Sequence, residues 1–187
     1  MKHFCFVVLV LLALAPRAQA EGIYLTEAQL AQKLFPEAPK TQAGTLTLTD
    51  AELAQVSRLF GYRVEQRTYR ALTVADDHEV RGTLFVLEVM GQNSPITFGV
   101  GVTRDGVIRG VEVMAYREPR GEEIRNPRFL RQLTGKNLND KLTLGVDVDA
   151  VSGATISSRS ATFAARKSLA LASVLMARAA PQSVAKR

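Results

Sequence analysis

Residues 97–107 read TFGVGVTRDGV, and this stretch decides the fold. Its apolar side chains recur at every second position up to Val102, which is the period of a β-strand. Asp105-Gly106 is a strong turn signal, because glycine accepts the positive φ that a tight hairpin turn requires. A mostly apolar run from Val107 to Tyr116 follows. We therefore expect the two runs to pair as an antiparallel hairpin.

The same period extends on both sides of this hairpin. The run Thr83–Met90 predicts a central strand, and an earlier strand is expected with Val64, Leu72 and Val74 on one side. Shorter strands are expected at residues 45–49 and 142–148. Consecutive strands with short connections predict an antiparallel meander.

Helical signals lie at both ends of this sheet. Thr26 with Gln29, and Thr49 with Glu52, have the spacing of capping boxes, which predicts helices that run to Phe35 and over 50–60. Asn126-Pro127 predicts a further helix start, with a stop at Gly135. Residues 156–180 read as an alanine-rich helix. The predicted fold class is α+β, an antiparallel sheet flanked by helices.

The N-terminus has the pattern of an export signal. Lys2 precedes the unbroken apolar run Phe4–Ala15, and residues 18–20 give the small-x-small pattern of a cleavage site. Twelve apolar residues are short for a membrane span, which needs about 20. We expect a signal peptide at 1–20, one domain at 21–180, a frayed tail at 181–187 and an exported, periplasmic protein that does not span the membrane after cleavage. The alternative is an uncleaved anchor.

Composition narrows the function further. Removing Lys2 and Arg17 with the signal leaves 22 basic against 18 acidic residues, a net charge of +4. No basic run is interleaved with aromatics, which argues against nucleic acid as a partner. The mature chain has no cysteine and one histidine, His78, which excludes cysteine-ligated clusters and histidine-rich metal sites. A redox role would need an organic cofactor.

Residues 149–158, DAVSGATISS, are the most informative stretch for function. Gly153 and Ala154 allow another group to approach the backbone closely. The helix that starts here offers unpaired N–H groups and a positive dipole end, which together suit a phosphate group. Hydroxyls that could donate to an anion stand at Ser152, Thr155, Ser157 and Ser158. From the residues alone, a simple helix cap is the favoured reading.

Asp149-x-x-Ser152-Gly153-Ala154-Thr155 followed by x-Ser-Ser resembles the flavinylation motif of the FMN-binding domain family. This family includes the C subunit of sodium-pumping NADH:quinone oxidoreductase and the G subunit of the Rnf complex. The resemblance implies that Thr155 carries FMN covalently, through a phosphoester made by a separate flavin transferase. Ala150 and Ser157 replace the family's usual Gly and Thr, and the acceptor hydroxyl is kept.

The resemblance covers roughly residues 95–175. Glu118-Pro119-x-Gly121 resembles the family's Glu-Thr-Pro-Gly loop, without the Thr, and the resemblance implies that this loop lies by the isoalloxazine ring. No acid–base pair, nucleophile or metal ligand set is expected.

Three functions remain open at this point. The resemblance favours an extracytoplasmic electron carrier that exchanges electrons with a membrane redox protein or another carrier. The alternatives are a small flavin reductase acting on a quinone or organic acid, and a flavin-binding or assembly module with no redox role.

Overall fold

The computed structural model describes residues 22–179. Within them, six strands form one sheet in the order β1-β6-β5-β4-β3-β2, with every neighbouring pair antiparallel. The strands are β1 (Gly22–Ile23), β2 (Lys40–Thr47), β3 (Thr68–Ala75), β4 (Val80–Met90), β5 (Pro95–Thr103) and β6 (Ile108–Tyr116). From β2 to β6, consecutive strands along the chain pair with one another, which confirms the predicted meander.

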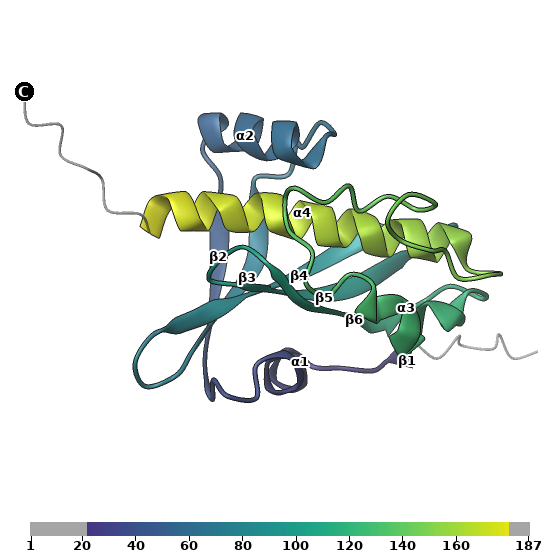
Figure 1. Ribbon diagram of the computed structural model, residues 1–187, viewed down its shortest axis with the longest axis horizontal. Coiled ribbons are helices and arrows are strands. Elements are labelled where there is room, and N and C mark those ends of the chain that lie inside the picture. The colour runs from purple at the N-terminus through teal and green to yellow at the C-terminus, as the bar shows by residue number, and fades with distance from the viewer. Residues whose placement is uncertain (1–21, 180–187) are drawn as a thin grey trace, which may run out of the picture.

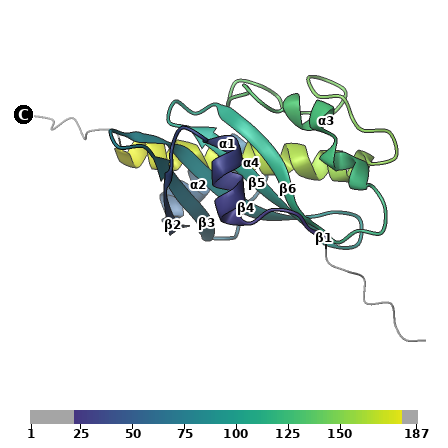
Figure 2. The ribbon, with the colours of Figure 1, turned by 90° about the horizontal axis from the view of Figure 1, so that it is seen from below.

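Helices cover both faces of this sheet, and the predicted α+β class is confirmed. They are α1 (Glu27–Leu34), α2 (Asp50–Phe60), the 3-10 helix η1 (Glu122–Arg125), α3 (Pro127–Arg131) and α4 (Thr155–Ala179). The long helix α4 lies along one face with α2 beyond it, and α1 lies against the opposite face (Figure 1). The view from below places α1 across the middle of the sheet (Figure 2).

The alternation in β5 explains why the two faces differ. Phe98, Val100 and Val102 are buried in the larger core, which α2 and α4 close. Gly99 and Gly101 alternate with them on the α1 face, where a Cβ on Gly99 would overlap Leu30. Small residues on that face therefore let α1 pack directly on the sheet backbone.

The predicted helix starts and the hairpin turn are confirmed. Thr26 and Thr49 each accept a hydrogen bond in a complete capping box, and Gly61 ends α2 with φ of 83°. Asn126 caps α3 with Pro127 in its first turn. Gly106, at φ 81°, makes the turn between β5 and β6.

Four expectations about the elements were wrong. Residues 142–148 are not a strand, because the Asp147 carboxylate takes the backbone N–H groups of Leu142 and Thr143 and closes a turn there. The strand expected at residues 45–49 is β2, which runs from Lys40 to Thr47. The α3 helix ends at Arg131 and continues as turns to Gly135.

The fourth wrong expectation placed Val64, Leu72 and Val74 on one side of a single strand. Val64 precedes the strand and packs in the larger core, whereas Leu72 and Val74 pack on the α1 face. The short strand β1, which pairs with the end of β6, had no signal in the sequence.

Two expectations about the termini lie outside the described residues: the signal peptide at 1–20 and the tail at 181–187. Among residues 22–179, no helix is long and apolar enough to cross a membrane.

Candidate functional site

Thr155 is the first residue of α4 and its side chain is exposed. It follows Gly153, which has φ of 80° and open space where a Cβ would point, and Ala154, which is buried. No hydrogen bond of the Thr155 hydroxyl to another described residue is present. The first N–H groups of a helix lack a carbonyl one turn back, and the dipole is positive there. A free hydroxyl therefore lies at an end of the helix that favours a phosphate.

The other hydroxyls of this segment divide into two groups. Ser152 is exposed like Thr155, whereas Ser157 and Ser158 are buried. The Ser158 hydroxyl donates to the carbonyl of Ala154 at 2.9 Å and accepts from the N–H of Val151 at 3.0 Å. Ser158 therefore holds the loop before α4 in shape, and its hydroxyl is not directed at the open side.

Ser157 ties the helix to the loop after β6. The Tyr116 hydroxyl donates to the carbonyl of Arg120 at 2.6 Å, so the contact of 2.9 Å between the two hydroxyls has Ser157 as donor. Burial raises the pKa of the Tyr116 hydroxyl, which keeps it protonated and able to donate. This pair of bonds fixes the path of residues 116–121 beside the first turn of α4.

Gly121 makes the closest approach between that loop and α4. Its φ is 91°, and a Cβ there would lie 2.7 Å from the Tyr116 hydroxyl and 3.0 Å from the Ser157 hydroxyl. The structure thus brings Gly121 against Ala154 and Ser157. Pro119 stands exposed on the same loop.

The Glu118 carboxylate is engaged by the β4–β5 turn. It accepts from the N–H of Asn93 at 2.7 Å and of Ser94 at 3.0 Å. Burial acts to raise the pKa of this carboxyl, but the backbone donors outweigh burial and hold the pKa below its usual value. Glu118 therefore stays charged and links the Pro119–Gly121 loop to a second loop.

Two anchoring residues had no signal in the sequence. The Gln132 side chain pairs with the backbone of Asp149 on both sides, accepting from its N–H at 2.9 Å and donating to its carbonyl at 3.3 Å. Ser160 donates to the carbonyl of Met90 at 2.8 Å. Both partners are backbone atoms far away in the chain. The carboxylate of Asp149 itself is exposed.

Within residues 22–179, no group of three or more His, Cys, Asp or Glu residues is placed to hold a metal ion. His78 lies in the polar turn between β3 and β4, where Asp76 accepts from its N–H at 2.8 Å. The first turn of α4 carries the exposed hydroxyl of Thr155, and this end of the helix favours negative charge.

Comparison with known proteins agrees with this arrangement. The family model of the FMN-binding domain matches residues 91–170, a range that contains the Glu118 loop and Thr155. The fold is similar to the crystal structure of NqrC from Shewanella oneidensis, with a TM-score of 0.51 and 20% identity over 78% of this chain and 88% of that one. No curated protein matches the chain.

Proposed function

Because the chain belongs to the FMN-binding domain family, we propose that it is an electron carrier that holds one FMN by a phosphoester to Thr155. The observation that carries this proposal is the exposed hydroxyl of Thr155 at the first residue of α4. The helix end stabilises the negative phosphate, and the open space at Gly153 leaves room for it. When bound, FMN supplies the redox chemistry, since its ring accepts one or two electrons.

The residues around Thr155 position and limit the cofactor. Gly121 and Ser157 fix the loop that carries Pro119 beside the first turn of α4. Ile156, which is 44% exposed, offers a second apolar surface next to the attachment point. Pro119 and Ile156 would contact the isoalloxazine ring of a bound flavin.

We also propose that the carrier works outside the cytoplasm. This proposal rests on the signal-like pattern of residues 1–20 and on the advantage of a covalently attached flavin outside the cytoplasm. A dissociated flavin would diffuse away, whereas a tethered one stays at high effective concentration. Maturation then requires a flavin transferase, and electrons pass to or from a membrane redox protein or another carrier.

The test is the intact mass of the mature protein from a host that co-expresses a flavin transferase. The expected result is an added mass equal to FMN minus water, mapped to the peptide that contains Thr155. Thr155→Ala should lose this mass completely and keep the fold. Ser152→Ala, which also removes an exposed hydroxyl from the same loop, should keep it.

An unmodified wild-type chain, from cells whose transferase modifies a control protein, would overturn the covalent proposal. Equal loss of flavin in Ser152→Ala and Thr155→Ala would mean that the loop as a whole, and not the Thr155 hydroxyl, determines attachment.

A further inference from the structure

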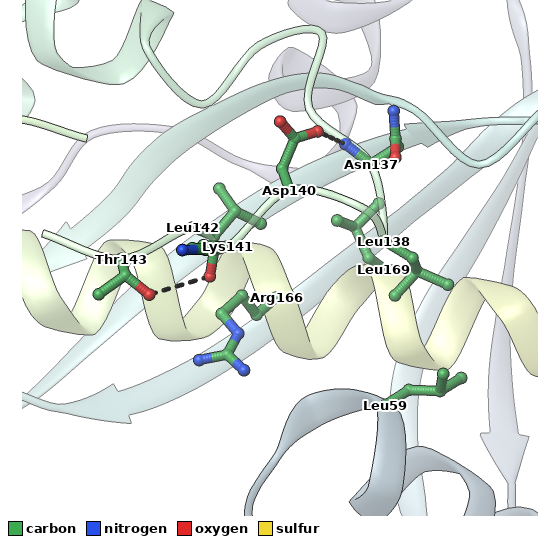
Figure 3. Close-up of a pocket in the computed structure, with 9 residues that line it drawn as sticks. All are labelled: Leu59, Asn137, Leu138, Asp140, Lys141, Leu142, Thr143, Arg166 and Leu169. Carbon is green, nitrogen blue, oxygen red and sulfur yellow. Dashed lines mark hydrogen bonds between the residues drawn. The ribbon is translucent and has the colours of Figure 1, made fainter. Parts of the chain in front are cut away.

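A groove runs along α4 beside the loop of residues 137–144. It consists of two hollows of ≈ 230 Å³ and ≈ 380 Å³ that share Leu142, Thr143 and Arg166 in their walls. The loop of residues 137–144 forms one wall, α4 the other, and the end of α2 closes the groove near Leu59 (Figure 3). Small-molecule sites have volumes of about 300–1,000 Å³, so the combined size is that of a ligand site.

The larger hollow has an aromatic wall. The rings of Tyr62 and Phe163 lie 5.4 Å apart between centroids, and Phe60 packs edge-on against Phe163 at 4.4 Å. Tyr62 is 55% exposed although it contacts two other rings. The ring planes of Tyr62 and Phe163 are tilted by 46°, so the exposed ring of Tyr62 by itself offers the surface on which a planar ligand can stack.

The rim of the groove is cationic. Arg159, Arg166 and Lys141 line it, and none of them forms an ion pair with another described residue. Arg166 lies above the ring of Tyr62, at 5.8 Å from its centroid. Elsewhere in the described chain most arginines are paired with carboxylates, for example Arg70 with Glu27 at 2.8 Å.

The only carboxylate among the described lining residues does not cancel this charge. Asp140 accepts the backbone N–H of Asn137 at 2.8 Å, as Figure 3 shows, and faces Lys136 at 3.7 Å. The groove therefore combines apolar side chains, an exposed aromatic ring and two guanidinium groups that form no ion pair with a described residue. Those features complement a planar aromatic ring system that carries a carboxylate.

We propose that this groove binds a two-ring aromatic carboxylate, with its rings stacked on Tyr62 and its carboxylate bound by Arg159 and Arg166. Arg159 stands one helical turn from Thr155 on the same face of α4. Phe163 is eight residues along, which is about 12 Å at 1.5 Å per residue. The bound ligand thus lies next to the proposed flavin but does not depend on it.

The probe is 2-naphthoate, with the neutral amide 2-naphthamide as its matched control, and binding is measured by calorimetry on the Thr155→Ala chain. Saturable binding of the carboxylate, at least about tenfold tighter than the amide, is expected because charge-assisted hydrogen bonds are the strong ones. Arg166→Gln and Arg159→Gln should each weaken it by about tenfold, by the same reasoning.

Arg128→Gln is the control substitution, because Arg128 is exposed on α3 and has no ion pair with any described residue. It should leave the affinity unchanged. Equal affinity for carboxylate and amide, no binding at all, or equal loss in all three arginine variants would overturn the proposal.

The same titration on the flavinylated protein separates this inference from the proposed function. Similar affinity in both forms supports a site for a free ligand beside the flavin. Loss of binding only in the flavinylated form would mean that the isoalloxazine ring of the attached FMN occupies the groove, and it would overturn the proposal. If Thr155 carries no flavin, the mass measurement reports it and the titration on Thr155→Ala still stands.

Discussion

The serine and threonine side chains of residues 152–160 lie on two sides of this segment, one anchored by hydrogen bonds and one open to solvent. On the anchored side, Ser157, Ser158 and Ser160 are buried and each hydroxyl is hydrogen-bonded. On the open side, Ser152 and Thr155 are exposed, and neither hydroxyl bonds another described residue. The difference shows that a run of small polar residues here serves two purposes. Three hydroxyls hold the helix end in place, and the hydroxyls of Ser152 and Thr155 are left exposed.

The largest expected difference in stability is between alanine substitutions at two glycines. Gly121 contacts the anchored hydroxyls, and Gly153 lies on the open side. Gly121→Ala places an alanine in a left-handed backbone conformation. Its Cβ also clashes with the hydroxyls of Tyr116 and Ser157, which lie 2.7 and 3.0 Å away. We expect a loss of about 3 kcal/mol in the free energy of unfolding. Gly153→Ala meets open space at a similar φ, so only the backbone strain remains, about 1 kcal/mol. Urea denaturation of both variants measures the difference.

Equal losses in the two glycine variants would contradict the view that the Gly121 contact anchors the loop. A smaller loss in Gly121→Ala than in Gly153→Ala would reverse the assignment of the two sides.

A second contrast compares two serines. Ser158→Ala leaves the partly buried N–H of Val151 without its acceptor, which we expect to cost about 1 kcal/mol of unfolding free energy. Ser152→Ala changes an exposed side chain and should stay within about 0.5 kcal/mol of the wild type. Thermal unfolding of both variants tests this, and a destabilised Ser152→Ala would mean that the open side is also structural.

The smallest expected effect is a dependence on pH. The pKa of Glu118 is held below its usual value by the N–H groups that its carboxylate accepts in the β4–β5 turn. A lowered pKa in the folded state contributes stability above the unfolded value of 4.5, and this contribution is lost as the pH falls through the folded value.

Glu118→Gln removes this titration, so its stability should fall less steeply than that of the wild type below pH 4.5. Parallel denaturation series at several acidic pH values measure the two slopes. Identical slopes would show that the link between the two loops does not depend on the charge of Glu118.

The parts of the fold that the sequence predicts well are those set by neighbouring residues. The capping boxes at Thr26 and Thr49, the turn at Gly106 and the Val–Gly alternation of β5 act within a few positions, and all are confirmed. The expected strand at 142–148 was wrong because one side chain, Asp147, takes over the backbone N–H groups that a partner strand would otherwise satisfy.

The site divides in the same way. Thr155 was predicted as the attachment residue from the family's motif and its place at a helix start; the helix start is confirmed, and the attachment stays a prediction. Gln132 and Ser160 were missed because their partners are backbone atoms of Asp149 and Met90. A backbone partner leaves no trace in residue type. Which hydroxyls turn inward also depends on the packing of α4 against the Tyr116 loop, which periodicity alone does not specify.

The position of α4 has a consequence for the order of events as the chain is made. The partners that other elements supply to the Thr155 loop and the start of α4, Met90, Tyr116, Gly121 and Gln132, all lie upstream of Thr155, and α4 is the last described element. A chain that emerges from its N-terminus therefore completes the supports first and the acceptor last. The hydroxyl acquires its surroundings only when α4 docks, so an enzyme that recognises those surroundings modifies finished molecules and passes over nascent or misfolded ones.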